Sequence, residues 1–314
     1  MVVDEVENMK IAVIGAGAMG ALYGSKLISS GQEVVLVDVW PEHIRAINEH
    51  GLKVEEETGD RKLVSIPAQF AEEVKEKKDL LIFFTKTMHT EKALASASHF
   101  IDPQSAVLIL QNGLGNVEKF AGYFAPENTF VGITTFTSQI LGPGHIKAGQ
   151  AGSTTIMQLK SGKDDRAAIL KRVLDAAGLN CVLKEDVFPA IWEKLAFNSA
   201  MNSLTAATRL NVGQLGRSAE AKKLAFQIIE EVLGVAEAKG LVVDKDRVKG
   251  LVIKDFESNQ EHKPSMLQDV LAGRRTEIES INGAAVREAE KLGLSLPATE
   301  ILYRLIKIID QALC

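Results

Sequence analysis

Three polar side chains recur at four-residue intervals in one segment of the chain, namely Lys194, Asn198 and Asn202. On a helix, positions four residues apart share a face and drift by only about 40° per step, so one ammonium and two carboxamides are predicted to point the same way. We call this set the polar stripe. Apolar residues occupy the other side of the same helix and would hold the stripe against a wall rather than in bulk water; they are Ile191, Leu195, Phe197, Ala200 and Met201.

The chemistry that suits the polar stripe is recognition of an oxygen-rich small molecule. A cationic donor between neutral donors and acceptors matches a substrate with a carbonyl, a carboxylate and hydroxyls. An ordinary amphipathic helix with a solvated polar face fits the same spacing, so the stripe alone does not decide between the two interpretations.

A glycine-rich turn near the N-terminus favours a functional interpretation. An apolar strand at residues 10–14 runs into a helical segment at 21–30, and Gly15, Gly17 and Gly20 lie between or beside them. Such glycines permit a tight turn, close approach of the backbone to a pyrophosphate, and tight helix–strand packing. A second strand at 33–39 supplies the context that this motif requires. We therefore predict a dinucleotide site at Gly15, Ala16, Gly17, Ala18, Met19 and Gly20, the alternative being a glycine-rich turn in another α/β sheet.

Asp38, at the end of the second predicted strand, carries information about the cofactor. A carboxylate there accepts hydrogen bonds from the ribose 2′- and 3′-hydroxyls and repels a 2′-phosphate, which favours NADH over NADPH. Arg45 follows in the next predicted helix and could approach a phosphate, although a surface arginine is the simpler interpretation.

Composition limits the remaining classes of function. The chain has 314 residues, 46% of them hydrophobic, and a net charge of −5, which argues against a broad nucleic-acid surface. Its apolar runs are too short to span a bilayer, and its start lacks the pattern of a signal peptide, so we expect no membrane partner and a cytoplasmic location. Two cysteines give no disulfide framework, and the six histidines show no metal-ligand spacing. We expect no metal; these histidines are His43, His50, His89, His99, His145 and His262.

Strand and helix signals alternate up to about residue 186, and only helical signals follow. We predict an α/β protein with an N-terminal Rossmann-like doubly wound sheet at residues 9–186, then an all-α C-terminal domain at 187–314 that binds substrate and carries the catalytic residues. Residues 1–8 form a short acidic extension of unknown role. Strands are predicted at 33–39, 79–85, 105–111, 129–136, 153–159 and 180–184, a hairpin at 52–57 and 62–66, and helices at 187–204, 219–239, 244–258, 274–292 and 297–313.

Side chains just after parallel strands carry extra weight, because ligands bind at the carboxyl ends of such strands. Lys86 and Asn112 lie there, although Asn112 before Gly113 is also an ordinary turn pair. In the helical part, Ser265 has the spacing of a capping box, and Glu277 reads as a surface carboxylate on a helix. None of these residues alone identifies a functional site.

Taken together, these motifs resemble the ketopantoate reductase family. The resemblance rests on the glycine turn, Lys86, the run 111–115, the run 192–198 with Asn202, and the runs 265–269, 276–279 and 281–283, and it extends from about Met9 nearly to the C-terminus. It implies reduction of 2-dehydropantoate to (R)-pantoate, in pantothenate biosynthesis.

The resemblance also implies roles for individual residues. It makes Lys194 the catalytic lysine and Glu277 the essential glutamate, which contacts either Lys194 or substrate. Substrate would be held by Asn112, Asn198, Asn202 and Ser265, the cofactor by Lys86 and Asn112 beside the glycine turn, and Asp269 matches a family aspartate.

In chemical terms, a hydride from NAD(P)H would reach a 2-keto carbon while Lys194 stabilises and then protonates the carbonyl oxygen. Partial desolvation would bring the lysine pKa towards a useful range. We expect Lys194 to meet the nicotinamide that the glycine turn holds.

Two branches of the same superfamily remain as alternatives for the cofactor and the substrate of this protein. The best-known family members prefer NADPH and have a basic residue where this chain has Asp38, and the run 37–47 is similar to NAD-dependent D-2-hydroxyacid dehydrogenases of the D-mandelate type. An NADH-dependent dehydrogenase for other branched 2-keto acids is therefore an alternative, and a dinucleotide sensor without catalysis is another. The apolar face of 219–239 suits either a homodimer interface or the core.

Overall fold

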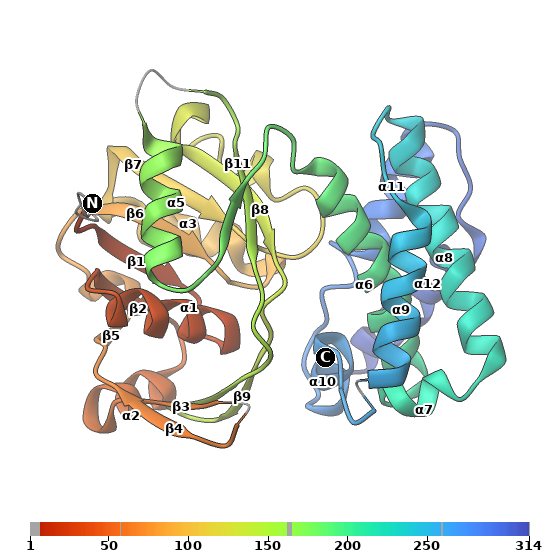
Figure 1. Ribbon diagram of the computed structural model, residues 1–314, viewed down its shortest axis with the longest axis horizontal. Helices are drawn as coiled ribbons and strands as arrows, with labels where there is room; N and C mark the ends of the chain where they lie inside the picture. The colour runs from red at the N-terminus through yellow and green to blue at the C-terminus, as the bar shows by residue number, and fades with distance from the viewer. Residues whose placement is uncertain (1–6, 57, 162–164, 259, 314) are drawn as a thin grey trace, which may run out of the picture. The chain divides into compact units, whose positions relative to one another are not determined.

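The structure is a computed structural model that describes residues 7–56, 58–161, 165–258 and 260–313 (Figure 1). It separates into two compact units. The sheet unit comprises Met1–Gln111 and Asn116–Val187, and the helical unit comprises Asn112–Gly115 and Phe188–Cys314. The predicted fold class, a Rossmann-like sheet followed by an all-helical part, is confirmed. Residues 1–6 of the predicted acidic extension lie outside the described residues.

Within the described residues, the main sheet has eight strands in the order β12-β11-β8-β7-β6-β1-β2-β5. All neighbours pair in parallel except β8 and β11. From β1 the chain continues to β2 on one side and later reaches β6 on the other, so the strand order reverses at β1, where such sheets bind ligands. The strands are β1 (Lys10–Ile14), β2 (Glu33–Val37), β5 (Ala68–Gln69), β6 (Lys78–Phe83), β7 (Ile101–Ile109), β8 (Thr129–Thr134), β11 (Thr154–Gln158) and β12 (Cys181–Leu183).

Both faces of this sheet are buried, because successive side chains of a strand point to opposite faces. Ile11 and Val13 of β1 pack into the core that contains α1 (Ala18–Ser29) and α5 (Arg166–Ala176). Ala12 and Ile14 of β1 point to the other face of the sheet and belong to a second core, which contains α3 (Thr90–Ala97). The continuous apolar runs in the sequence therefore correspond to strands covered on both sides.

A second, four-stranded sheet belongs to the same unit, in the order β4-β3-β10-β9. The predicted hairpin is present as β3 (Leu52–Glu55) paired antiparallel with β4 (Arg61–Val64). The other two strands, β9 (Ser138–Gly142) and β10 (His145–Ala148), were not predicted, because β9 is only half-buried and has no apolar run. They occupy the connection between β8 and β11 in place of a crossover helix, which fits the antiparallel pairing of those two strands.

The helical unit is built around α6 (Phe188–Thr208), against which α8, α9, α10, α11 and α12 pack. The buried members of α6 include Leu195, Ala200 and Met201, three of the residues predicted to back the polar stripe. The other helices are α7 (Val212–Gly216), α8 (Ala219–Ala238), α9 (Lys245–Ser258), α10 (Ser265–Leu271), α11 (Asn282–Lys291) and α12 (Pro297–Ala312). None of the described helices has the length and apolar character needed to cross a membrane.

The prediction of a helix at 274–292 is wrong in its first part, since α11 begins only at Asn282. Glu277, predicted on a helix, lies in a turn instead. One cause is the buried carboxylate of Asp310, which accepts hydrogen bonds from the Thr276 amide (3.1 Å) and from Thr276 Oγ1 (2.9 Å). These bonds direct the backbone of Thr276 towards α12 and away from a helical path.

The capping-box interpretation of Ser265 is also wrong. Pro264 is the residue that caps α10, and it makes no side-chain capping bond, while Ser265 is already the first helical residue. The reciprocal bond of a capping box cannot form either, because Pro264 has no amide hydrogen that Gln268 could accept. Gln268 Nε2 donates instead to the Lys263 carbonyl at 2.7 Å.

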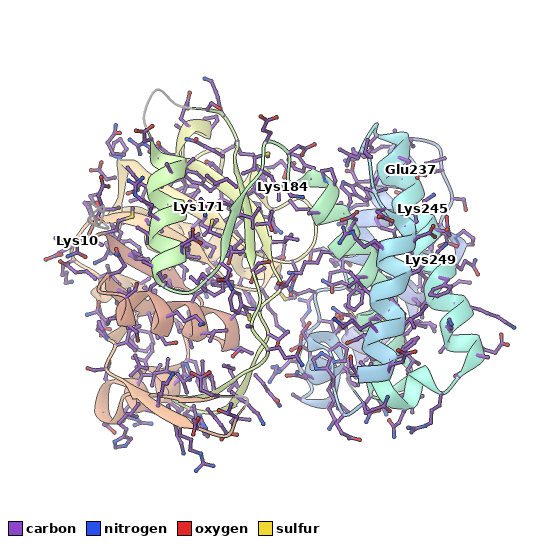
Figure 2. The ribbon with its side chains drawn as sticks, in the orientation of Figure 1. Lys10, Lys171, Lys184, Glu237, Lys245 and Lys249 are labelled. Carbon is purple, nitrogen blue, oxygen red and sulfur yellow. The ribbon has the colours of Figure 1, made fainter. Side chains whose placement is uncertain are left out.

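Ion pairs join α9 to α8 on the surface of the helical unit. Lys245 contacts Glu237 at 2.7 Å and Glu230 at 3.2 Å, and Lys249 also pairs with Glu230 (Figure 2). These carboxylates raise the pKa of Lys245, and the two lysines lower the pKa of Glu230. Each exposed pair contributes at most about 1 kcal/mol, so burial around α6 remains the larger stabilising factor.

Candidate active site

The glycine turn after β1, residues 15–20, has a conformation that only glycine permits at two of its positions. Gly15 has φ +91°, and a Cβ there would lie 2.7 Å from the Thr85 amide nitrogen. A Cβ at Gly20 would lie 1.9 Å from the Gly15 carbonyl oxygen. The turn is further fixed by a hydrogen bond of 2.8 Å from the Gly15 amide to the Val37 carbonyl.

Gly17 differs from these two glycines. Apart from the chain neighbours of Gly17 and the backbone of its own helix, no heavy atom of the described residues lies within 4 Å of the Cβ position at Gly17, so this position is open. Gly17 is also the residue that caps α1, where amide groups at the start of the helix are free to bind an anion. The turn therefore fits a pyrophosphate that approaches the backbone at Gly17, and Ala18 and Met19 provide the next amides of the first helical turn.

Asp38 follows β2 and is half-buried. Its Oδ1 accepts hydrogen bonds from the amides of Val39 (2.7 Å) and Trp40 (3.1 Å), which orient the carboxylate at the carboxyl end of the strand. Arg45 lies in α2 (Pro41–His50) and is exposed, in agreement with its interpretation as a surface arginine.

Lys86 lies after β6, as predicted, and its carbonyl accepts the His89 amide at 2.8 Å. A residue that the sequence did not single out, Gln111, joins the ends of two neighbouring strands. Its Nε2 donates to the Thr85 carbonyl (2.7 Å) and to Thr90 Oγ1 (2.8 Å). Gln111 therefore fixes the chain immediately before Asn112.

In the helical unit, all three members of the polar stripe lie on α6. Asn202 is buried, and Lys194 and Asn198 are half-buried. The predicted helix is thus present, and its polar face is partly withdrawn from solvent. This burial is more than the solvated face of an ordinary amphipathic helix would show.

Burial is the main reason that the pKa of the Lys194 ammonium is lowered. Desolvation lowers the pKa of Lys194 to about 8, and the negative charge of Glu277 opposes this shift by raising it. The two residues identified by resemblance therefore interact electrostatically. An ammonium with a pKa near neutral pH is suited to give up a proton during turnover.

The turn that carries Glu277 is fixed to α6 and to the segment after β7. Asn282, fully buried, donates from Nδ2 to the Ser199 carbonyl at 3.1 Å. The Leu114 amide donates to the Ser280 carbonyl at 3.0 Å. Gly113, at φ +87°, is required there, because a Cβ would lie 2.1 Å from that same carbonyl oxygen. The structure thus assigns Asn112 to the helical unit, with Glu277 and the polar stripe.

The remaining predicted residues lie on α10, which packs against α6. Ser265 is exposed at the first position of this helix. Asp269 is buried and accepts a hydrogen bond of 3.1 Å from Arg274 Nε, so it has at least a structural role. The predicted residues therefore form two groups, the glycine turn, Asp38 and Lys86 in the sheet unit, and Asn112, Lys194, Asn198, Asn202, Ser265 and Glu277 in the helical unit.

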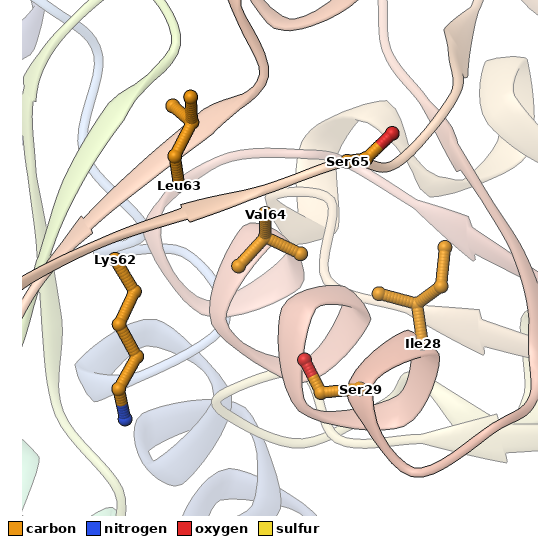
Figure 3. A pocket seen from close by; sticks show the side chains of 6 residues that line it. All are labelled: Ile28, Ser29, Lys62, Leu63, Val64 and Ser65. Atoms are coloured by element: carbon orange, nitrogen blue, oxygen red, sulfur yellow. The ribbon is translucent and has the colours of Figure 1, made fainter.

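A separate pocket of about 440 Å³ lies on the sheet unit (Figure 3). It is lined by residues at the end of α1 and along β4, and none of its lining residues belongs to the two groups above. Its lining residues are Ile28, Ser29, Lys62, Leu63, Val64 and Ser65. Among the residues that the structure describes, no group of histidine, cysteine and carboxylate side chains has the arrangement of a metal site.

The comparisons with known proteins match both units of the chain. The family described as ketopantoate reductase PanE/ApbA matches residues 11–161, and its C-terminal domain matches residues 186–310. A 2-dehydropantoate 2-reductase of Lactococcus lactis is 34% identical over 97% of this chain and 99% of its own length. One from Pyrococcus abyssi is 33% identical over 95% and 97%.

Solved structures extend the likeness to the fold. D-mandelate dehydrogenase with NADH and anilino(oxo)acetate is 35% identical, with a TM-score of 0.93 over 97% of this chain and 99% of that one. The 2-dehydropantoate 2-reductase of Geobacter metallireducens is 29% identical, with a TM-score of 0.88 over 95% and 99%.

A glycine turn at the strand-order reversal and a helical unit with a half-buried lysine and its carboxylate partner define an oxidoreductase of the two-part, Rossmann-containing class. Within that class, the chain belongs to the ketopantoate reductase PanE/ApbA family.

The free space at Gly17 leads to a test of the glycine turn. Gly17→Ala should unfold at the wild-type temperature, since the new methyl group meets no described atom and φ is −59°. It should nevertheless weaken NADH binding by about tenfold or more, because the methyl group occupies the approach to the pyrophosphate. Fluorescence titration with NADH and thermal unfolding measure the two effects. Gly20→Ala is the matched control that should lower the unfolding temperature, and wild-type affinity in Gly17→Ala would contradict this site.

Proposed function

We propose that this protein reduces 2-dehydropantoate to (R)-pantoate, with a nicotinamide dinucleotide as hydride donor. The observation that carries the proposal is the half-buried Lys194 on α6, with a pKa of about 8 and Glu277 as its charge partner. Relatives that are 32–34% identical over nearly the whole chain and are named 2-dehydropantoate 2-reductase support the choice of substrate.

Lys194 is the proposed proton donor. A nicotinamide dinucleotide held by the glycine turn would supply the hydride for the 2-keto carbon, and negative charge would then develop on the carbonyl oxygen. The Lys194 ammonium stabilises this charge by a hydrogen bond and then transfers its proton to the oxygen, which leaves a hydroxyl and a neutral amine. Solvent restores the proton between turnovers.

Glu277 has the proposed role of keeping Lys194 charged. Desolvation alone would lower the pKa of Lys194 further, and the charge of Glu277 raises it again, so the ammonium form persists at neutral pH.

We propose that Asn112, Asn198, Asn202 and Ser265 bind the carboxylate and hydroxyl of the substrate, since amides and a hydroxyl can both donate and accept. Rigid placement of these groups lowers the entropic cost of reaching the reactive geometry.

We propose NADH as the preferred cofactor, bound by the glycine turn with Asp38 and with Lys86 nearby. The support is Asp38, whose carboxylate is oriented by two backbone amides and would repel a 2′-phosphate. The D-mandelate dehydrogenase that is 35% identical was solved with NADH. Family resemblance to NADPH-dependent members is the opposing consideration.

A second candidate function is an NADH-dependent D-2-hydroxyacid dehydrogenase for other 2-keto acids. The likeness to D-mandelate dehydrogenase, with a TM-score of 0.93, favours it specifically. Values of kcat/KM for ketopantoate, 2-ketoisovalerate and phenylglyoxylate, each with NADH and NADPH, distinguish the two. A ketopantoate value no better than the others would overturn the first proposal.

The homodimer expected from the sequence stays a prediction. The apolar face of α8, which was one candidate for its interface, is packed in the core of the helical unit, since Ile228, Val232 and Leu233 are fully buried. Burial in the core was the other interpretation that the sequence allowed for this face.

The pKa of Lys194 predicts a pH dependence. For reduction, kcat/KM should be constant below pH about 8 and fall about tenfold per pH unit above it, since only the ammonium form can donate a proton. Lys194→Ala should lower turnover by about 10²- to 10⁴-fold while NADH still binds, and exposed Lys184→Ala is the matched control. Steady-state rates from pH 6 to 10 measure this. A flat profile, or full turnover in Lys194→Ala as for a dinucleotide sensor, would contradict the assignment.

The negative charge of Asp38 leads to the prediction that the protein prefers NADH to NADPH. Asp38→Asn keeps an oxygen that can accept from the Val39 and Trp40 amides but removes the negative charge. The ratio of the NADPH and NADH dissociation constants should therefore fall by about tenfold, mainly through tighter NADPH binding. Parallel fluorescence titrations measure the ratio. An unchanged ratio would mean that Asp38 does not select the cofactor.

A further inference from the structure

His43, in α2, is fully buried although it carries two polar ring nitrogens. Its Nε2 lies 2.9 Å from the Ala16 carbonyl oxygen, inside the glycine turn. Its Nδ1 lies 3.0 Å from the Gly144 amide nitrogen, between β9 and β10. One side chain thus connects the glycine turn to the second sheet.

The two partners fix the state of the ring. The Gly144 amide can only donate, so Nδ1 is the acceptor, and Nε2 therefore carries the hydrogen and donates to the Ala16 carbonyl. A doubly protonated ring would lose the bond to Gly144. Burial lowers the pKa of His43, while the Ala16 carbonyl and the charge of Asp38 oppose that shift, which agrees with a neutral ring.

The bond to Ala16 has a consequence for the neighbouring amide. The peptide unit that joins Ala16 to Gly17 is planar and trans, so its C=O and N–H point in opposite directions. A carbonyl held towards His43 therefore directs the Gly17 amide away from His43. Gly17 is the residue that caps α1, and the space at its Cβ position is open.

Asp38, the other residue of the sheet unit that we propose to contact the cofactor, is connected to the same ring through Trp40. Trp40 stacks on His43, with ring centroids 4.9 Å apart and an interplanar angle of 8°. The Trp40 amide donates to Asp38 Oδ1 at 3.1 Å. His43 therefore contacts both the residue that orients Asp38 and the turn proposed to bind the pyrophosphate.

We propose that His43 is a positioning residue for the dinucleotide: through its Nε2–H bond to the Ala16 carbonyl it directs the Gly17 amide at the pyrophosphate, before the cofactor arrives. This inference rests on the proposed function. It assigns to His43 no contact with cofactor or substrate, so its effect is on binding and not on the chemical step.

Three variants separate this role from simple packing. His43→Gln places an amide donor near the position of Nε2, His43→Asn places an amide near the position of Nδ1, and His43→Leu removes both polar groups. We expect His43→Leu and His43→Asn to raise the NADH dissociation constant by about tenfold, and His43→Gln to stay within about threefold of wild type. KM for NADH should rise in parallel, with kcat at saturating NADH unchanged.

NADH titration by fluorescence and thermal unfolding of the full chain provide the readouts. If His43→Leu does not fold, the comparison rests on the Gln and Asn variants, which each conserve one of the two hydrogen bonds. Equal NADH affinities in all folded variants and wild type would overturn the positioning role, as would affinities that follow the unfolding temperature alone with no rescue by Gln. Failure of the wild-type protein to bind either NADH or NADPH would instead overturn the proposed function.

Discussion

The proposed chemistry depends on one electrostatic balance, the opposition between burial and a carboxylate at Lys194. Burial on α6 removes water from the ammonium and lowers its pKa to about 8, while the charge of Glu277 limits the fall. With burial alone, the lysine would lose its proton too readily to donate it, and with full solvation it would hold the proton too tightly. The turn that carries Glu277 is held in place by the Thr276–Asp310 bonds and by the bond from Asn282 to α6.

In the sheet unit the governing constraint is steric. Gly15 and Gly20 are required by the close approach of backbone atoms, whereas the Cβ position at Gly17 is open. The hydrogen bonds that fix this turn come from Val37 at the end of β2 and from His43 in α2. Binding of the dinucleotide would then require little rearrangement of the chain, which reduces the ordering cost of association.

The sequence predicted those features that depend on local pattern. The apolar runs of the parallel strands, the glycine turn and the four-residue spacing of Lys194, Asn198 and Asn202 each reflect one element and its periodicity. It did not predict features that depend on distant partners. Glu277 leaves the helical pattern in part because Asp310 binds Thr276, and the two hydrogen bonds of His43 depend on Ala16 and Gly144, which are distant from it in the sequence. The strands β9 and β10 were missed because pairing, and not an apolar run, defines them.

Direct titration of Lys194 tests the central balance most closely. In a protein with isotopically labelled lysine, the NMR signal assigned with a Lys194→Arg variant should titrate near pH 8, well below the usual lysine value of 10.5. In Glu277→Gln the midpoint should move lower still, because the charge that opposes desolvation is gone. A midpoint close to 10.5 in the wild-type protein, or one that does not fall in Glu277→Gln, would contradict the account.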